Sequence, residues 1–471
     1  MQESWSSTIQ TPLTIAVVGM GKIGLPLAVQ YASHGHRVIG CDINAQVVET
    51  INAGHSHVHE EPELLTEVPR LVHEGKLSAT QDTASAVRQA AVVVIIVPVF
   101  VDADHQVDFT MMDAATKAVG SGLQAGTLVI YETTLPVGTT ACRLAHLLQQ
   151  ASQLRAGKDF WLAYSPERVS SGSIMRDLRQ YPKVVGGIDA ASTAAAKAFY
   201  GQVLDAAIIT MASTDEAEFV KLIETTYRDV NIALANEYAC YADTHGLNVM
   251  AAIAAANTQP YSHIHTPGVG VGGHCIPVYP YFLFANPLDR ASEEGSAKPT
   301  LRLARHARVI NDAMAVYTVD RLEALLGPLT GQAVLILGVA YRGNVRETAF
   351  TSARLLQDAL IERGVRVYAD DPLFSDTELR QLGYTPLPTG QEEQMVALIL
   401  QNDHTSYHTL DITRFSNCRV LLDGRLALRE KRAGIEEAGV RYVSIGDGGF
   451  AQAQQRSIVG QSVVVGLERA R

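Results

Sequence analysis

The chain has 471 residues, of which 47% are hydrophobic and 18% are charged. A single hydrophobic core rarely grows beyond ~250 to 300 residues, so we expect two or three domains. The formal net charge of −11 disfavours a general affinity for nucleic acid or for an anionic membrane, since both need clustered positive charge.

The five cysteines, at positions 41, 142, 240, 275 and 418, are odd in number and show neither CxxC nor Cys/His ligand spacing. We therefore expect neither a disulfide framework nor a metal site. The first twelve residues lack a basic stretch followed by an apolar one, and no uninterrupted apolar run approaches the ~18 residues of a membrane span. These features favour a cytoplasmic protein that does not bind membranes.

Short apolar runs alternate with helix-like stretches from residue 13 to about residue 211. The runs cover residues 15–18, 92–97, 128–130, 161–163 and 207–209. This alternation predicts parallel βαβ units.

Residues 213–256 and 302–326 carry only helical spacing, and residues 257–280 between them are dense in glycine and proline. A loop of this length in a compact domain is usually functional or disordered. The strand pattern returns at residues 334–338, 365–368, 396–400 and 419–422. We therefore predict an α/β protein with a Rossmann-like domain over residues 1–211, a central helical region over 212–327 and a second Rossmann-like domain over 328–471.

The first apolar run leads directly into a glycine-rich turn, whose residues are Gly19, Gly21, Lys22, Ile23 and Gly24. The glycines permit a tight turn, the approach of a pyrophosphate and close helix packing; an amphipathic helix follows. About twenty residues on, Asp42 ends the next strand, where a carboxylate can accept from ribose hydroxyls and repels a 2′-phosphate. The pattern favours NAD over NADP. The alternatives are a glycine turn for another ligand and, for Asp42, a helix cap or a solvated acid.

The loop at residues 267–277 places Cys275 after four glycines, among them Gly270, Gly272 and Gly273. Converging amides can bind an oxyanion and favour a thiolate, so Cys275 is a candidate nucleophile. A small buried thiol in a tight turn is the alternative. On the preceding helix, Lys221, Thr225 and Arg228 share one face by their spacing. Lys221 could stabilise an oxyanion or act as a base there, or could be a solvated surface charge.

The order of these motifs resembles the UDP-glucose and UDP-N-acetylhexosamine 6-dehydrogenase family from residue 15 to about 425. The motifs are the dinucleotide loop, Glu-Thr-Thr-Leu-Pro-Val-Gly-Thr at 132–139, Ser-Pro-Glu-Arg-Val at 165–169, Lys221 with its following leucine, Gly-Gly-His-Cys at 272–275 and Leu-Asp-Gly-Arg at 422–425. The resemblance implies that NAD takes a hydride from the sugar C6, that Cys275 holds the aldehyde as a thiohemiacetal, that a second NAD oxidises this adduct to a thioester, and that water releases the carboxylate.

The resemblance also implies roles for single residues. Thr134 would hold a water beside the cofactor, Glu167 would be the general base of thioester hydrolysis, and Lys221 would stabilise the oxyanion. Arg346 would contact NAD. The UDP-sugar would be held by Lys221, Thr225, Arg228, Gly270, Gly272, Gly273, Tyr341, Arg342 and Arg425, with arginine forks on the diphosphate. The alternatives are a strand end for Thr134, a cap or a pair with Arg168 for Glu167, and exposed surface for the two late arginines.

The sequence departs from the family pattern in three ways. Thr225 stands where Asn is usual, and Tyr279 stands where Asp is usual. No arginine or lysine lies between Arg228 and position 290, so an arginine that many members send to the partner's substrate is missing. His263 and His265 are the nearby polar candidates, or are ordinary loop histidines. We still expect a homodimer or a higher homo-oligomer, because residues 308–312 and the long central helices resemble the family's dimer core.

Residues 166–169 and 228–233 are more similar to the N-acetylhexosamine branch than to the glucose branch. We expect UDP-N-acetylmannosamine as substrate, then UDP-N-acetylglucosamine, with UDP-glucose as the alternative from the other branch. The uronate product would serve surface polysaccharide synthesis. A two-electron hydroxyacid dehydrogenase with a structural Cys275, and an NAD-sensing regulator, are the remaining hypotheses.

Overall fold

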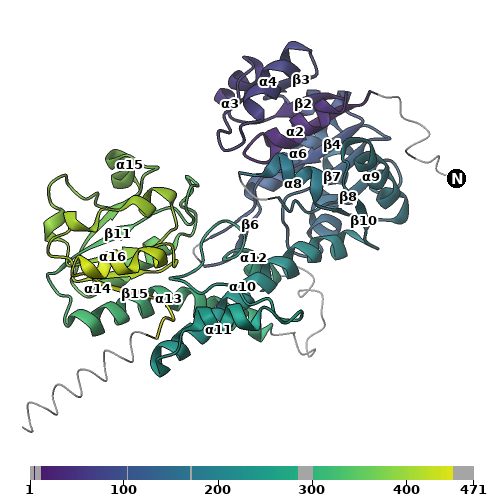
Figure 1. Cartoon of the computed structure of the whole chain (residues 1–471). Coiled ribbons are helices and arrows are strands. Elements are labelled where there is room, and N and C mark those ends of the chain that lie inside the picture. Colours follow the sequence, from purple (N-terminus) through teal and green to yellow (C-terminus); the bar gives the residue numbers. More distant parts are fainter. Residues whose placement is uncertain (1–4, 6–11, 103, 170–171, 285–300, 449–471) are drawn as a thin grey trace, which may run out of the picture. The chain divides into compact units, whose positions relative to one another are not determined.

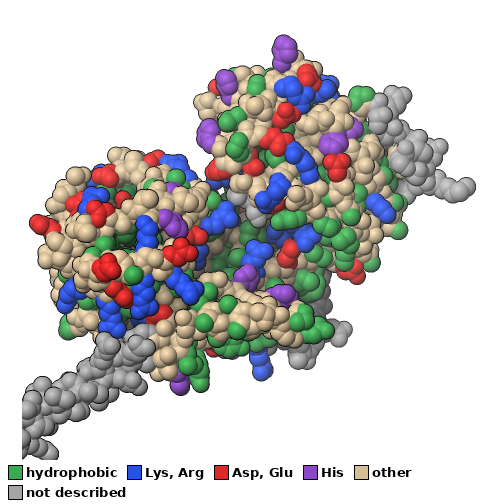
Figure 2. Space-filling model, viewed as in Figure 1, with side chains coloured by type: hydrophobic (Ala, Val, Ile, Leu, Met, Phe, Trp, Pro, Cys, Tyr) green, Lys and Arg blue, Asp and Glu red, His purple; other side chains and the backbone are tan. Residues whose placement is uncertain are grey.

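The computed structural model describes residues 5, 12–102, 104–169, 172–284 and 301–448. The chain forms two compact units (Figure 1). Unit 1 comprises Met1–Glu224 with Tyr279–Pro299, and unit 2 comprises Thr225–Val278 with Thr300–Arg471. On the face shown in Figure 2, acidic and basic side chains are interspersed over both units.

Unit 1 is built on an eight-stranded sheet with the order β10-β9-β8-β7-β4-β1-β2-β3. The strands are β1 Thr14–Val18, β2 Arg37–Cys41, β3 Leu77–Thr80, β4 Val92–Ile95, β7 Leu128–Tyr131, β8 Trp161–Tyr164, β9 Lys183–Gly187 and β10 Ile208–Thr210. The prediction of parallel units is correct from β1 to β8 but wrong at the next pair, where β9 runs antiparallel to β8. An antiparallel neighbour needs no crossover, so the chain between β8 and β9 returns to the same edge of the sheet.

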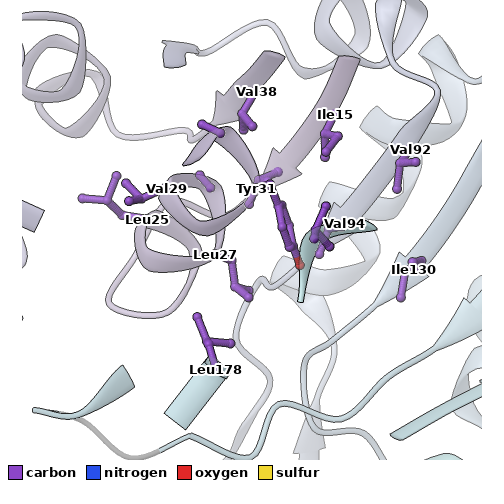
Figure 3. Packing of buried hydrophobic residues seen from close by; sticks show 14 of the residues in the cluster. Ile15, Leu25, Leu27, Val29, Tyr31, Val38, Val92, Val94, Ile130 and Leu178 are labelled. Atoms are coloured by element: carbon purple, nitrogen blue, oxygen red, sulfur yellow. The ribbon is translucent and has the colours of Figure 1, made fainter. Parts of the chain in front are cut away.

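The helices of unit 1 surround or adjoin this sheet in the chain. They are α2 Gly24–Ser33, α3 Ala45–Asn52, α4 Leu64–His73, α5 Thr83–Gln89, α6 Thr110–Gly122, the π-helical turn η1 Thr139–Leu144, α7 Ala145–Ser152, α8 Ile174–Gln180, α9 Ala190–Val203 and α12 Tyr279–Phe284; a small hairpin pairs β5 Phe100–Val101 with β6 Val107–Asp108. The helix that follows the glycine turn, α2, is buried at every residue from Gly24 to Ala32. The sequence predicted an amphipathic helix with a single buried face, so the burial of α2 is wider than expected. The helix packs on β1 and β2 and also against α4 and α8. Figure 3 shows Leu25 and Tyr31 of α2 in this core, with Ile15 of β1 and Leu178 of α8.

Unit 2 combines long helices with an all-parallel sheet of order β12-β11-β13-β14-β15. The strands are β11 Ala333–Leu337, β12 Arg366–Asp370, β13 Ala397–Leu400, β14 Val420–Asp423 and β15 Arg441–Ser444; the helices are α10 Thr214–His245, which begins in unit 1, α11 Val249–Ala256, α13 Arg302–Leu326, α14 Ser352–Glu362, α15 Asp376–Gln381 and α16 Arg432–Glu437. The helical run expected at 213–256 is two helices, because Gly246 has φ 68° and the Asn248 side chain caps α11.

The predicted fold class, two Rossmann-like α/β parts with a central helical region, is confirmed. Within the described residues, no helix combines the length and the hydrophobicity needed to cross a membrane.

Candidate functional site

The dinucleotide loop lies between β1 and α2. Gly19 has φ +94°, and a Cβ there would lie 2.9 Å from the carbonyl oxygen of Ile96; a Cβ on Gly24 would lie 1.8 Å from the carbonyl oxygen of Gly19. Gly21 is exposed, and a Cβ there would meet nothing within 4 Å. The first and third glycines are therefore required by the turn and its packing, while the second faces open space where a pyrophosphate can approach.

The Asp42 carboxylate holds this loop from the end of β2. It accepts hydrogen bonds from the Met20 and Asn44 amides, each at 2.9 Å. The cap of α3 is Asn44, so the helix-capping alternative for Asp42 does not hold. Each Asp42 oxygen keeps a lone pair that a ribose hydroxyl could use, so these residues fit NAD. Lys22 is exposed and pairs with Glu60 at 3.2 Å.

A buried charge cluster lies at the carboxyl edge of the same sheet. Lys183, the first residue of β9, donates to Glu132 at 2.8 Å and to Glu167 at 3.0 Å. Glu132 follows β7 and Glu167 follows β8. The side chains of Lys183, Glu132 and Glu167 are 6%, 0% and 10% exposed. Glu132 also accepts from the hydroxyls of Tyr31 at 3.0 Å and Tyr200 at 2.6 Å.

The two carboxylates of the cluster differ in their surroundings. Burial raises the pKa of Glu132, although Lys183 opposes this. Burial acts in the same direction on Glu167, but Lys183 and the Arg168 amide outweigh it and lower the pKa of Glu167. Burial also disfavours the Lys183 ammonium, yet the two carboxylates raise its pKa overall. The net shifts of the two carboxyl pKa values therefore run in opposite directions, upward for Glu132 and downward for Glu167.

The alternative pairing of Glu167 with the Arg168 guanidinium is not observed. Glu167 accepts from the backbone amides of Arg168 at 2.6 Å and Val169 at 3.0 Å, while the Arg168 guanidinium pairs with Glu224 at 2.8 Å. Thr134, predicted to hold a water, is buried after β7 in the same segment as Glu132.

Sequence reasoning gave no role to Lys183, Tyr31 or Tyr200. The signal that could have found Lys183 is a lysine at the start of the short segment Lys183–Gly187, whose residues are otherwise valine and glycine and are all buried.

On α10, Glu218 anchors the helix that carries Lys221. Its carboxylate accepts from the Gly138 amide at 2.6 Å, and from the Thr140 amide and hydroxyl at 2.8 and 2.6 Å. Burial raises the pKa of Glu218 to about 8, although these donors oppose the shift. Lys221 is 8% exposed, which argues against a solvated surface charge. Of the two residues predicted to share its face, Thr225 is buried and Arg228 is exposed.

The cysteine loop belongs to unit 2 and is held at several points. The Gly268 amide donates to the Asn236 side chain at 2.9 Å, and the Gly273 amide donates to the Ala349 carbonyl at 2.9 Å. A Cβ on Gly272 would lie 2.7 Å from the Tyr341 Cβ, and one on Gly270, where φ is +143°, would lie 2.9 Å from the Ser352 Cβ. Glycine is thus required where the loop passes over residues 341–352.

Cys275 is half-buried on this loop. The preceding residue, His274, is exposed and pairs with Glu347 at 3.3 Å. A partly accessible thiol on a fixed glycine-rich backbone is more typical of a nucleophile than of a cysteine buried in a core, so the nucleophilic role of Cys275 is favoured.

The structure brings two of the predicted UDP-binding residues, Tyr341 and Arg425, to this loop. Tyr341 packs on Gly272 and Gly273, and the Arg425 guanidinium lies beside Gly268, where a Cβ would be 3.4 Å from Nη1. Burial lowers the pKa of Arg425, with Asp403 and Asp423 acting against it. Arg342 is half-buried next to Tyr341.

Arg346, predicted to contact NAD, is exposed; it forms an ion pair with Glu378 and donates to the Leu373 carbonyl. It lies in unit 2, whereas the dinucleotide loop lies in unit 1. Its predicted role is untested.

The residues that depart from the family pattern have defined places. Tyr279 begins α12, and its ring contacts Phe282 at 5.3 Å between centroids. Asn231 joins the loop after α11: it donates to the His263 carbonyl at 2.7 Å and accepts from the His265 amide at 2.9 Å. Both histidines therefore contact α10 through their backbones.

Comparison with known families gives three matches in chain order. Residues 13–204 match the NAD binding domain of the UDP-glucose/GDP-mannose dehydrogenase family, residues 215–313 its central domain and residues 335–430 its UDP binding domain. A UDP-N-acetyl-D-mannosamine dehydrogenase of Pyrococcus horikoshii is 34% identical over 440 residues, which cover 91% of this chain and 99% of the relative. The chain belongs to the UDP-glucose/GDP-mannose dehydrogenase family.

Two further similarities agree with this assignment. An NDP-N-acetyl-D-galactosaminuronic acid dehydrogenase of Ralstonia solanacearum is 35% identical over 89% of this chain and 97% of its own length. The solved structure of the Pyrococcus horikoshii UDP-D-ManNAc dehydrogenase superposes with a TM-score of 0.82 at 33% identity, covering 93% of this chain and all of that one. The protein is an NAD-dependent nucleotide-sugar dehydrogenase acting on a CH–OH group, so the predicted family, enzyme class and cofactor are confirmed.

Proposed function

We propose that this dehydrogenase oxidises C6 of UDP-N-acetylmannosamine to a carboxylate, removing four electrons in two steps. The observation that carries the proposal is Cys275: a half-buried thiol on a glycine loop that Tyr341 and Asn236 fix in place, with Arg425 beside the same loop. Relatives that match nearly the whole chain are named for this substrate, which supports the choice of sugar.

NAD, when bound, accepts one hydride in each oxidation. The Cys275 thiolate bonds to C6 of the aldehyde and forms a thiohemiacetal. Loss of the second hydride from this tetrahedral carbon gives a thioester, which the free aldehyde could not form directly. Covalent attachment also retains the reactive aldehyde between the two oxidations.

Residues outside the cysteine loop complete the proposed chemistry. Glu167 takes a proton from the water that attacks the thioester, Thr134 orients that water, and Lys221 stabilises the oxyanion. The lowered pKa of Glu167 keeps this base ionised, although it also lowers the proton affinity of the carboxylate.

The proposed grip on UDP uses the arginine forks of Arg342 and Arg425 on the diphosphate, with Tyr341 packed beneath the loop. Arginine keeps its charge when partly buried, so the lowered pKa of Arg425 does not remove the cation near neutral pH. We further propose that the protein acts in the cytoplasm as a homodimer or a higher homo-oligomer.

The deciding test is the NADH yield per UDP-N-acetylmannosamine with purified protein. Two NADH and no free aldehyde support the proposal; one NADH supports a hydroxyacid-type dehydrogenase with a structural cysteine. UDP-N-acetylglucosamine and UDP-glucose are run in parallel, and a faster turnover of either would overturn the proposed sugar. Binding of NAD without turnover of any UDP-sugar would support a regulator.

Mass spectrometry tests the covalent route separately. After brief exposure to substrate and NAD, we expect a sugar adduct on Cys275 in the wild type, a stalled ester in Cys275→Ser and no adduct in Cys275→Ala. An adduct on another residue, or turnover by Cys275→Ala, would contradict the route.

A further inference from the structure

We propose that Lys183 and Glu132 are positioning residues that set the charge of Glu167 for thioester hydrolysis. The inference rests on the proposed function, in which Glu167 is the base. It concerns two buried groups that have no part in the mechanism described above.

The backbone fixes the position of the ammonium. In the antiparallel pairing of β8 with β9, Ala163 faces Gly187 and Tyr164 faces Gly186. Continuing this register past the end of β8 brings Lys183 opposite Glu167, in agreement with their contact of 3.0 Å. A lysine side chain on a flexible stem would not otherwise be held so closely.

The cluster contains more acidic than basic groups, and this imbalance affects the ionisation of Glu167. Two carboxylates share one ammonium, and all three groups are nearly removed from solvent. Like charges this close disfavour each other's ionisation, whereas the shared cation favours both. Glu132 has two neutral phenol donors, Tyr31 and Tyr200, while Glu167 has two backbone amides of its own segment.

The groups that face Glu167 are therefore Lys183 from β9, Glu132 from the end of β7, the two tyrosines of α2 and α9 that act through Glu132, and Arg168 beside it. The Arg168 guanidinium is occupied by Glu224. Lys183 is thus the principal cation of Glu167, and Glu132 is its competitor. When both carboxylates are ionised the trio carries one net negative charge, and a proton taken up by Glu167 neutralises it.

Hydrolysis of the thioester moves one proton through Glu167. Water bonds to the thioester carbon while one of its protons moves to Glu167. The C–S bond breaks, and its electron pair goes to the Cys275 sulfur, which takes the proton from Glu167. The product acid ionises, so one proton is released for each carboxylate formed. Glu167 returns to its charged form beside Lys183.

The test is the pH dependence of the loss of the Cys275 thioester, followed by rapid quench and mass spectrometry. Lys183→Met should move the acid limb to higher pH, because Glu167 loses its cation; at a fixed pH on that limb, hydrolysis should slow about tenfold for every pH unit that the limb moves. Glu132→Gln should move the same limb to lower pH, because Glu167 loses its competitor. Lys183→Arg should restore most of the wild-type profile.

Opposite shifts are a result that loss of packing cannot produce. Ser192→Ala is the matched control: it removes a buried neutral hydrogen bond from the Leu162 amide of β8 and should leave the midpoint in place. Circular dichroism checks that each variant is folded. If Lys183→Met does not fold, the Glu132→Gln shift alone decides.

Shifts in one direction, or none, would overturn the proposal. Its failure is separable from failure of the proposed function. If the wild type gives two NADH and Glu167→Gln accumulates the thioester while the limb stays fixed, only the positioning role is lost. If Glu167→Gln accumulates no thioester, the role of Glu167 as base is lost, and this inference with it.

Discussion

The Glu218 carboxylate accepts hydrogen bonds from both the backbone amide and the hydroxyl of Thr140. These bonds fasten the start of α10 to the turn that follows the Thr134 segment. The carboxyl is buried, and its pKa lies near 8 instead of the ordinary 4.5. A raised pKa means that the folded state binds a proton more tightly than the unfolded state. This contribution to stability is complete below the ordinary pKa and is lost as the pH rises towards about 8.

The Glu218→Gln variant should therefore lose less stability than the wild type between the ordinary carboxyl pKa and about pH 8. Urea unfolding at several pH values measures the difference in unfolding free energy between the variant and the wild type. The contributions of the other titrating groups cancel in this difference. Parallel curves for the two proteins would contradict the assignment. Phe219→Ala changes an exposed neighbour and should follow the wild-type curve.

Two glycines of the dinucleotide loop should respond in opposite ways to alanine. Gly24→Ala places a methyl group against the Gly19 carbonyl, which should destabilise unit 1 by ~1–3 kcal/mol or more. Gly21→Ala meets no protein atom, so thermal stability should be retained while NAD binding weakens. Calorimetry with and without NAD measures both effects. Equal thermal losses in the two variants would show that the open side of the loop is misassigned.

Gly272→Ala should slow formation of the Cys275 adduct by at least tenfold, on the order of 1.4 kcal/mol. Its new methyl group would press on Tyr341 and on the Phe350 carbonyl, so the loop must move. The control is Gly434→Ala in α16, where nothing lies within 4 Å and adduct formation should be unchanged. Unchanged adduct formation in Gly272→Ala would contradict a fixed loop.

Removing Arg308 should be far more damaging than removing its whole ion pair. The guanidinium is buried and meets Asp229 at 2.5 Å, and Asn311 also donates to that carboxylate. Arg308→Met leaves a buried uncompensated charge and should cost ~3–5 kcal/mol, whereas Asp229→Asn with Arg308→Met should recover much of this loss. Urea unfolding gives both values. A double variant less stable than Arg308→Met alone would contradict the prediction.

The proposed homodimer can be tested on α10. Tyr227, Leu234, Tyr238 and Tyr241 are 58%, 39%, 44% and 59% exposed, and the last three repeat at the helical spacings of four and three. Such a row of large apolar side chains favours burial against a second copy. Tyr238→Asp with Tyr241→Asp should halve the mass found by analytical ultracentrifugation. Leu303→Asp, on α13, tests whether the effect is specific to α10.

The sequence could predict the features that follow from local pattern. Gly19 and Gly24 follow from the strand–turn–helix order, and the strand at Ala333–Leu337 from its apolar run. The pattern failed at β9, because a charged Lys183 opens it and two glycines close it, and it also missed β3 and β15. The division at residues 211 and 327 is still a prediction, and the two compact units do not decide it.

The contacts within the site could not be predicted, because they join distant positions. Glu132 and Lys183 are 51 residues apart, and Tyr31 reaches Glu132 over 101. Periodicity reports which face of an element is buried, and it carries no information on which of the other elements supplies a charge. The roles of Thr134, Glu167 and Arg346 came from resemblance and stay predictions, of which the Glu167→Gln variant tests one.

The reversal of β9 has a consequence for how the enzyme places charge. In a parallel sheet, every strand ends at the edge where ligands bind, so only residues at strand ends or in the following loops reach that edge. A reversed strand presents its first residue there instead. Had β9 run parallel, Lys183 would lie about 13 Å away at the opposite edge, and Gly187 would stand beside Glu167. One change of strand polarity thus supplies a cation without lengthening any loop.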